Sequence, residues 1–507
     1  MLRVISTPLG GNGLTRAALS GSTPGSWYVA RPHGADAWRT RASRILAALE
    51  SPAWLPSLRD ALEPTGRAAE RLGAAADRGF VVTTGQQPAL FGGPLYNLWK
   101  ALSVLAFADA LQQETGLPVA PVFWAATDDS DFAEAASTVV AMPDGARRIE
   151  LTHMEDPGLP MAVVPVGDLG PQLDALRSAA GSAPYPAVLD SVVRAYSPGA
   201  TIGSAYVTLM RELLAHLGVA VLDASHPAVR ERGHSLLVRA LERAGAVESA
   251  LVARDAELKA EGFSPQVQTV RGRSLVFAAV DGRRARVPIG RVSEAMEAPA
   301  SDLSPNVLLR PILERSILPT VAYIGGPAEI AYFAQVGAVA GALQVEAPLI
   351  LPRWSGMVIE PRIQKILDRY SLDAEQFSDP HAVETRLARE SVPPDVRSGV
   401  DELRRVVQEQ IARLSTMDHG LVSGRVMEGL RRNMLHRIER LERRYAAAVK
   451  RKGNAALHDV AAARSSLFPF GMPQERALNG VPLLARYGSE LFDSVMTEVE
   501  PHAKSLA

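Results

Sequence analysis

Three segments of the chain place polar side chains where they can contact a ligand. The first covers residues 84–96 and is followed by Lys100. Its glycines allow a ligand to approach the backbone closely, and free N–H groups at the start of the next helix favour an anion. The candidate binding residues are Thr84, Gly85, Gln86, Gln87, Gly93 and Tyr96, and Lys100 is a candidate catalytic cation. The alternative is a plain turn and a solvated lysine, since the segment matches neither a Walker loop nor Gly-x-Gly-x-x-Gly.

The second segment is acidic. Asp128, Asp129 and Asp131 follow a predicted strand, and Glu134 lies close by in the sequence. Such carboxylates can hold Mg²⁺ or the ammonium group of an amino acid, and one of them can serve as a general base. All three aspartates are therefore candidate catalytic residues, and Asp128 and Asp131 are candidate metal ligands. The alternative is a helix N-cap with carboxylates that complement the helix dipole.

The third segment, residues 323–329, again predicts a glycine-rich helix start. Its candidate binding residues are Tyr323, Gly325, Gly326 and Glu329, and Arg310 upstream can bind a carboxylate or phosphate. The alternatives are that Glu329 only complements the helix dipole and that Arg310 is an ion-pair partner. The sequence contains no His-x-His, His-Glu-x-x-His or Gly-x-Ser-x-Gly pattern. It therefore indicates neither a histidine metal site nor a hydrolase nucleophile.

The elements that would position these segments alternate between strands and helices. Short runs of apolar and β-branched residues predict buried strands at residues 80–84, 119–126, 219–223, 320–324 and 348–351. Apolar residues at helical spacing predict helices after Pro94 and at residues 328–343. This order is typical of an α/β protein with an open parallel sheet. Ligands of such sheets bind at the carboxyl ends of the strands, where the three segments are expected.

Three further regions depart from this alternation. Residues 242–299 predict a small insertion with strands at 263–270 and 274–280 and a turn at 281–282. Residues 394–455 are charged and carry apolar stripes at spacings of three and four, which predicts a coiled-coil hairpin. We therefore expect a core domain at 1–393, the hairpin at 394–455, and a C-terminal segment at 456–507 that packs back on the core.

Composition narrows the class of protein. The chain has 507 residues, no cysteine and a formal net charge of -1. The lack of cysteine excludes disulfides, thiolate nucleophiles and cysteine-ligated metals. The first ten residues lack the pattern of a signal peptide, and no apolar run reaches the ~18–20 residues that a membrane helix needs. We therefore expect a cytoplasmic protein with neither membrane nor nucleic acid as a partner.

Taken in order, these segments resemble the cysteine-adding enzyme family of bacillithiol biosynthesis. The matching runs are residues 83–96, 121–124, 218–223, 308–311, 318–332, 467–469 and 473–476. The Thr-Gly-Gln-Gln run at 84–87 and the Tyr-Ile-Gly-Gly-Pro run at 323–327 are long and unusual, so the match is specific. The resemblance implies a Rossmann-like core with connecting insertions, an α-helical coiled-coil hairpin and a homodimer.

The resemblance also implies an activity. Members of the family are ligases that form an amide between L-cysteine and the amine of glucosaminyl-malate, the last step of bacillithiol biosynthesis, with ATP. Activation of a carboxylate by phosphoryl or adenylyl transfer calls for Mg²⁺ and cationic groups. Lys100 and Arg310 would then supply positive charge, and the aspartates of the acidic segment would hold the metal.

The sequence departs from the family pattern at two positions. Where relatives carry Glu-Asp-His-Asp-Phe, this chain has Asp-Asp-Ser-Asp-Phe at residues 128–132, so Ser130 replaces a histidine. A few residues later Ser137 replaces a second histidine. A divergent member that ligates a different amino acid or amine is therefore one alternative. A non-catalytic scaffold is another, because residues 425–452 form a markedly basic helix that could track phosphates.

Overall fold

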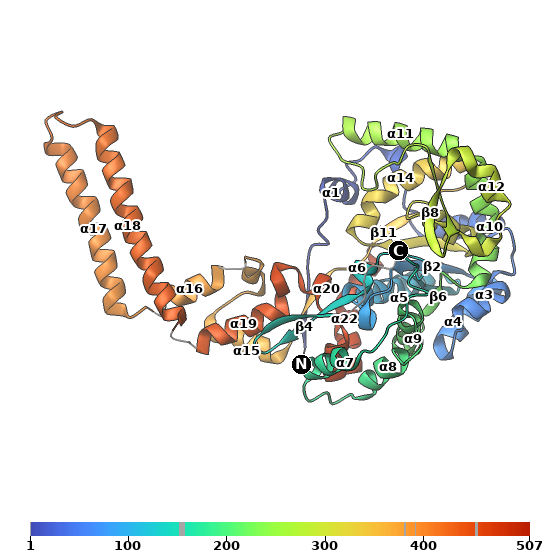
Figure 1. The fold of residues 1–507 in the computed structure, drawn as a ribbon, viewed down its shortest axis with the longest axis horizontal. Coiled ribbons are helices and arrows are strands. Elements are labelled where there is room, and N and C mark those ends of the chain that lie inside the picture. The colour runs from blue at the N-terminus through green and yellow to red at the C-terminus, as the bar shows by residue number, and fades with distance from the viewer. Residues whose placement is uncertain (1, 152–157, 380–381, 391, 452–454) are drawn as a thin grey trace. The chain divides into compact units, whose positions relative to one another are not determined.

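The computed structural model describes residues 2–151, 158–379, 382–390, 392–451 and 455–507 (Figure 1). They form two compact units, which we describe separately. The larger unit comprises residues 2–140, 148–358 and 475–507, and the smaller comprises residues 141–147 and 359–474. Within the described ranges, no helix combines the length and apolar character that a bilayer crossing requires.

A five-stranded parallel sheet forms the centre of the larger unit. Its spatial order is β11-β10-β2-β3-β6. The strands are β2 (Phe80–Gln86), β3 (Val119–Ala125), β6 (Ala220–Asp223), β10 (Thr320–Gly325) and β11 (Ile350–Pro352). Numbered by sequence within the sheet, the order is 5-4-1-2-3, so the direction of winding reverses between β2 and β10. This is the Rossmann-like arrangement, and it confirms the predicted α/β parallel sheet.

The strands form where the sequence supplies consecutive buried apolar residues. β2 and β3 pair in register from Phe80–Val119 to Gln86–Ala125, and every residue of β3 is buried. Because helices cover both faces of a parallel sheet, its strands lack the alternation of polar and apolar residues seen on a solvated sheet. All five predicted strands are therefore confirmed, with ends that shift by at most two residues.

A long helix follows each of the two central strands. Helix α5 (Tyr96–Thr115) follows β2 and packs against β2 and β3. Gly116, with φ of +70°, ends it in the left-handed region that glycine adopts without strain. Helix α14 (Pro327–Leu343) follows β10 and begins with proline at its first position, where the missing N–H is not needed. Both helix starts therefore lie at the carboxyl edge of the sheet.

Other helices and short strands belong wholly or partly to the larger unit. The helix α22 (Ser489–Lys504) packs against α5, so the end of the chain returns to the larger unit. The remaining elements are β1 (Arg3–Ser6), α1 (Gly13–Leu19), α2 (Ala35–Ala47), α3 (Trp54–Leu62), α4 (Gly66–Arg78), α6 (Phe132–Ala135), β4 (Ser137–Met142), β5 (Gly145–Glu150), α7 (Gly170–Ala180), α8 (Ala187–Ala195), α9 (Ile202–Leu214), α10 (Pro227–Glu242), α11 (Ala244–Ala260), α12 (Val292–Met296), α13 (Arg310–Ile317), β12 (Gly356–Ile359), α20 (Gln474–Ala477) and α21 (Val481–Tyr487).

A small antiparallel sheet lies in the region predicted as an insertion. It has the order β8-β7-β9 and comprises β7 (Arg273–Val280), β8 (Arg283–Pro288) and β9 (Leu303–Pro305). The predicted strand at 274–280 and turn at 281–282 are confirmed, but the predicted strand at 263–270 is wrong. There the backbone pairs with a side chain, because Gln335 accepts from Val267 N at 3.0 Å and donates to Val267 O at 2.7 Å.

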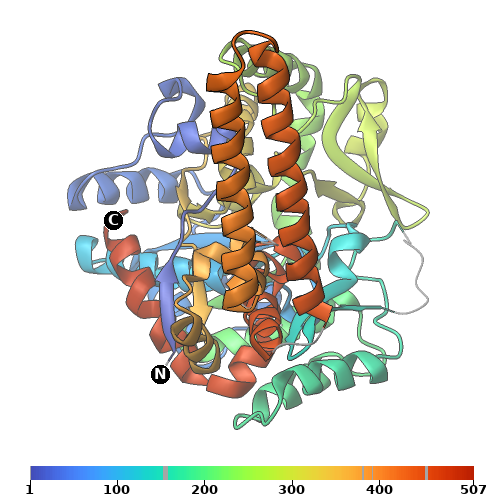
Figure 2. The ribbon, with the colours of Figure 1, turned by 90° about the vertical axis from the view of Figure 1, so that its left-hand side faces the viewer.

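The smaller unit contains two long helices that lie side by side (Figure 2). They are α17 (Pro394–Met417) and α18 (Gly424–Arg451), and the shorter helices of the unit are α15 (Pro361–Tyr370), α16 (Ala382–Glu390) and α19 (Ala455–Leu467). Ile411 and Ile438 of the predicted apolar stripes are buried, whereas Leu414 is 54% exposed. The helical coiled coil is confirmed, and residues 452–454 of the predicted hairpin lie outside the described residues.

Candidate functional site

A cavity of about 520 Å³ opens at the carboxyl ends of β2 and β10, at the switch point of the sheet. The predicted residues that line it are Gly85, Gln86, Gln87, Tyr96, Lys100, Asp128, Asp129, Arg310, Gly326 and Glu329. The predicted residues Thr84, Gly93, Asp131, Tyr323 and Gly325 are not part of the lining. The structure thus brings all three predicted segments to one pocket.

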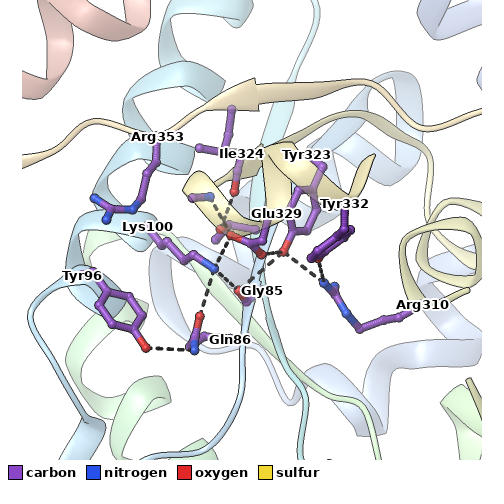
Figure 3. A network of polar contacts seen from close by, with 12 residues as sticks. Gly85, Gln86, Tyr96, Lys100, Arg310, Tyr323, Ile324, Glu329, Tyr332 and Arg353 are labelled. Carbon is purple, nitrogen blue, oxygen red and sulfur yellow. Dashed lines mark hydrogen bonds and ion pairs between the residues drawn. The ribbon is translucent and has the colours of Figure 1, made fainter. Parts of the chain in front are cut away.

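A buried ion pair joins the two glycine-rich segments. Lys100 Nζ lies 2.6 Å from Glu329 Oε2 and donates to Gly85 O at 2.6 Å and to Gln86 Oε1 at 2.9 Å (Figure 3). Glu329 Oε2 also accepts from Gly326 N at 2.6 Å, which caps α14. Burial lowers the pKa of Lys100, and the Glu329 carboxylate opposes this shift. All three ammonium protons therefore have acceptors within the chain.

A second cluster lies around the guanidinium group of Arg310. Its Nη2 donates to Tyr332 Oη at 3.0 Å and to Tyr323 Oη at 3.3 Å, and its Nη1 lies 3.4 Å from Glu314 Oε2. Glu314 is 1% exposed and accepts a short hydrogen bond from Thr83 Oγ1. Burial raises the pKa of Glu314 to about 7, although Arg310 and Thr83 oppose the shift. The Arg310 guanidinium is therefore held in place from behind.

A third cluster centres on Glu134, which stands at the acidic side of the pocket. Its Oε1 accepts hydrogen bonds from Tyr96 Oη at 3.0 Å and from Gln86 Nε2 at 3.2 Å. Burial raises the pKa of this carboxyl, the Tyr96 hydrogen bond lowers it, and the nearby Asp131 and Asp129 raise it further. Residues from β2, α5 and α6 thus meet in one hydrogen-bonded group.

The three predicted aspartates take different positions. Asp128 is 7% exposed, and its Oδ2 lies 3.9 Å from Arg284 Nη2. Asp129 Oδ1 accepts from Asp131 N at 2.9 Å. Asp131 is exposed and caps α6, accepting from Glu134 N at 3.2 Å, as the helix-cap alternative predicts. The structure therefore brings Asp128 and Asp129 to the pocket and leaves Asp131 outside its lining.

The positions of these carboxylates determine whether the chain can hold Mg²⁺. In the part of the chain that the structure describes, no three histidine or acidic side chains are grouped as a metal site. Among the described side chains, the protein alone therefore does not form a site for Mg²⁺. Mg²⁺ is, however, commonly held by one or two carboxylates together with phosphate oxygens, and Asp128 with Asp129 fits that pattern. Asp128 and Asp129 therefore suit Mg²⁺ only when a phosphate ligand supplies further oxygen ligands.

Several arginines that the sequence did not single out complete the pocket. Arg284 and Arg286 of β8 lie over the ring of Phe277, at 4.4 and 5.6 Å from its centroid. Arg353 forms a buried two-pronged ion pair with Glu475, at 2.6 and 2.9 Å. An alternating strand such as β8 carries arginines whether or not they meet a ligand, so spacing alone offered no signal for Arg284 and Arg286.

The predicted residues outside the lining support it from behind. Thr84 Oγ1 donates to Ile324 O at 2.7 Å and so joins β2 to β10. Tyr323 Oη lies 2.5 Å from Glu329 Oε1. Gly93 has φ of +74°, and a Cβ there would lie 2.6 Å from Ala89 Cβ. A side chain at Gly325 would likewise collide with Ile350, at 2.6 Å. These residues shape the pocket without facing it.

The fold and the pocket define a Rossmann-like α/β protein with a charged cavity at its switch point and a helical coiled coil. The family model described as "Bacillithiol biosynthesis BshC, N-terminal Rossmann-like domain" matches residues 58–354. The model described as "Bacillithiol biosynthesis BshC, C-terminal coiled-coil domain" matches residues 356–505. The chain therefore belongs to the BshC family of bacillithiol biosynthesis, as the resemblance in its motifs predicted.

Similar proteins from several bacteria cover most of the chain. A protein of Solibacter usitatus is 33% identical over 442 residues, which are 83% of this chain and 83% of the relative. A protein of Koribacter versatilis is 31% identical over 460 residues, covering 84% and 85%. A protein of Staphylococcus carnosus is 27% identical over 442 residues, covering 81% of each. All three carry the name "Putative cysteine ligase BshC".

Proposed function

We propose that this chain is an ATP-dependent ligase that joins L-cysteine to the amino group of glucosaminyl-malate, in the last step of bacillithiol biosynthesis. The names of its relatives and its family membership support a cysteine ligase. One observation carries the choice of substrates: the pocket holds positive charge that the protein leaves uncompensated.

That charge belongs to two arginines. Lys100, Arg310 and Arg353 are each paired with a glutamate. By contrast, Arg286 and Arg476 line the cavity without a carboxylate partner among the described residues. A guanidinium that lines a cavity without a counter-ion favours an anionic ligand, because ligand binding then supplies the missing charge; Arg286 is half-buried, whereas Arg476 is exposed. Two such groups suit the two carboxylates of a malate moiety.

The nucleotide and the metal have their own place in the proposal. ATP would supply the phosphoryl or adenylyl group that activates the carboxylate of cysteine. Asp128 and Asp129 would hold Mg²⁺ together with phosphate oxygens. The N-terminal ends of α5 and α14 add the positive ends of two helix dipoles near the pocket. Lys100, whose protons are all used inside the chain, fixes these two helix starts and is a positioning residue in this scheme.

The direct test is a mass-spectrometric assay. Purified protein is incubated with glucosaminyl-malate, L-cysteine, ATP and Mg²⁺, with an active family enzyme in parallel. We expect a product with the mass of the amide and a matching consumption of ATP. Folded protein that yields no product while the parallel enzyme is active would contradict the proposed function.

A matched pair of variants tests the role of the free arginine. Arg286→Gln removes the charge in the pocket, whereas Arg283→Gln removes an exposed charge from the same strand outside the lining. We expect Arg286→Gln to weaken glucosaminyl-malate binding by roughly tenfold to a hundredfold, the range of a charge-assisted hydrogen bond. Arg283→Gln should bind as the wild type does. Equal affinities for both variants would contradict the assignment.

Ser130 favours a second candidate function. It lines the pocket at the position where the family pattern has a histidine. A serine hydroxyl neither gains nor loses a proton near neutral pH, and it does not bind a metal as an imidazole does, which favours a different amino acid or amine as the substrate of this member. Ligase activity profiled across amino acids separates the two cases, and a strict preference for cysteine would exclude the second.

The homodimer is also a proposal. On α17 and α18, Leu403, Leu414, Leu430, Met434 and Tyr445 are between 40% and 54% exposed. A stripe of apolar side chains at this spacing favours contact with another helix. Light scattering coupled to size exclusion should give twice the mass of one chain, and Leu414→Glu with Met434→Glu should reduce it to one.

A further inference from the structure

Glu134 differs from a carboxylate that only stabilises the fold. Its Oε1 is fixed by two neutral donors, the hydroxyl of Tyr96 and the amide of Gln86. Its Oε2 has no hydrogen-bond partner within the described ranges, and the residue lines the cavity. One oxygen is therefore oriented by the protein, and the other is available to a ligand.

Two other carboxylates of the pocket have cations opposite them, and a third accepts a backbone N–H with one oxygen. Asp128 lies opposite Arg284, Glu329 is paired with Lys100, and Asp129 Oδ1 accepts from Asp131 N. Within the described residues, Glu134 has no ion-pair partner. Because an ionised carboxylate in a partly buried site is stabilised by a cation, a positively charged ligand group suits this position.

We infer that Glu134 binds the ammonium group of the amine substrate through Oε2 and takes a proton from it, which makes Glu134 a catalytic residue. This inference rests on the proposed function, which supplies glucosaminyl-malate as the amine. The transfer breaks one N–H bond, forms one O–H bond on Oε2 and leaves the nitrogen with a free electron pair. The neutral amine is the form that can attack a carbonyl carbon.

The surroundings of Glu134 suit this transfer. Burial raises the pKa of its carboxyl, against the hydrogen bond from Tyr96. A carboxylate with a raised pKa is a stronger base than an exposed glutamate, and therefore takes a proton from an ammonium group more readily. The hydrogen bonds from Tyr96 and Gln86 hold the carboxyl plane while the proton arrives.

Calorimetric binding without ATP tests the inference. The ligands are glucosaminyl-malate and its N-acetylated form, which keeps both carboxylates and loses the basic nitrogen. We expect wild-type protein to bind the amine about tenfold to a hundredfold more tightly than the acetylated form. Glu134→Gln preserves the hydrogen bonds of Oε1 but neither carries charge nor takes a proton, so this preference should disappear.

Two further variants keep the test decisive. Glu297→Gln changes an exposed glutamate outside the pocket and should preserve the preference. Tyr96→Phe removes one donor to Oε1 and should reduce the preference for the amine over the acetylated form severalfold. This variant provides a second test if Glu134→Gln melts at a lower temperature than the wild type. Buffers of different ionisation enthalpy should show that amine binding changes proton uptake in the wild type and not in Glu134→Gln.

The outcomes separate the two proposals. If the wild type forms the amide and Glu134→Gln still prefers the amine, the inference about Glu134 is wrong and the proposed function stands. If the wild type forms no amide and binds both ligands equally, both are wrong. Loss of the preference in Glu134→Gln, with normal affinity for the acetylated ligand, supports the inference.

Discussion

Replacing Lys100 by methionine tests whether its buried ion pair holds the two sides of the pocket together. The side chains of Lys100 and Glu329 are 4% and 12% exposed. Methionine keeps the length of the lysine stem but leaves the Glu329 carboxylate without its cation. It also leaves Gly85 O and Gln86 Oε1 without the donors that they have in the wild type. Such an uncompensated buried charge is strongly unfavourable.

The expected cost follows from the protonation of Glu329. In the wild type, burial raises the pKa of Glu329, but Lys100, Tyr323 and Arg310 outweigh burial, and the net shift is downward. In the variant the folded chain can avoid a lone charge by protonating the carboxyl, whose ordinary pKa is 4.5. At pH 7 this costs about 3.4 kcal/mol, within the roughly 3–5 kcal/mol found for broken buried pairs. Near pH 5 the same step costs about 0.7 kcal/mol.

Urea unfolding followed by tryptophan fluorescence measures this difference. We expect Lys100→Met to lose about 3–5 kcal/mol of unfolding free energy at pH 7 and much less at pH 5. Lys259→Met, on the exposed side of α11, is the matched control and should cost well under 1 kcal/mol. A loss below about 1 kcal/mol at pH 7, or a loss that does not depend on pH, would refute the reasoning.

Three other predictions concern stability. Gly93→Ala should lower the unfolding free energy by at least about 1–3 kcal/mol, because φ is +74° and the new Cβ would lie 2.6 Å from Ala89 Cβ. Gly341→Ala in α14, where a Cβ would have nothing within 4 Å, should be neutral or stabilising, and thermal melts of both variants measure the difference. Because burial raises the pKa of Glu314 to about 7, the folded chain keeps a proton that the unfolded chain has released, and this group's contribution to stability falls as pH rises from about 4.5 to 7. The unfolding free energy should therefore fall with rising pH, by up to about 1.4 kcal/mol per pH unit, and Glu314→Gln should remove this dependence. An unchanged dependence on pH in the variant would exclude Glu314 as its source. Arg353→Met and Glu475→Gln should each lower the unfolding free energy by about 3–5 kcal/mol, and the double variant should lower it by less than the sum of the two losses. Additive losses in denaturant unfolding would contradict the pairing.

The sequence was sufficient to predict the sheet, because its signals are local. The five central strands are consecutive apolar runs, and glycine or proline marks the ends of the helices beside them. Gly116 ends α5 where the pattern placed it, and α14 begins at Pro327, one residue before the predicted start. The three segments predicted to bind a ligand lie at one pocket because parallel strands end at the same edge.

The rest of the pocket could not be predicted because its residues come from distant parts of the chain. Arg286 lies on a hairpin that the sequence presented as a peripheral insertion, and its position beside the cavity depends on how that hairpin packs. The interpretation of Lys100 as a catalytic cation was open for a similar reason. The ion-pair partner of Lys100 is Glu329, which is far along the chain, so the sequence could not reveal that the charge of the lysine is neutralised inside the protein.

The pairing of Arg353 with Glu475 has a consequence for how the protein is made. A ribosome releases the strands of the sheet long before it releases Glu475, which closes the buried ion pair. Until then the nascent chain carries an arginine whose final environment excludes water but whose counter-ion does not yet exist. The pocket wall therefore matures only near the end of translation, and a chain truncated before Glu475 would keep Arg353 without its counter-ion.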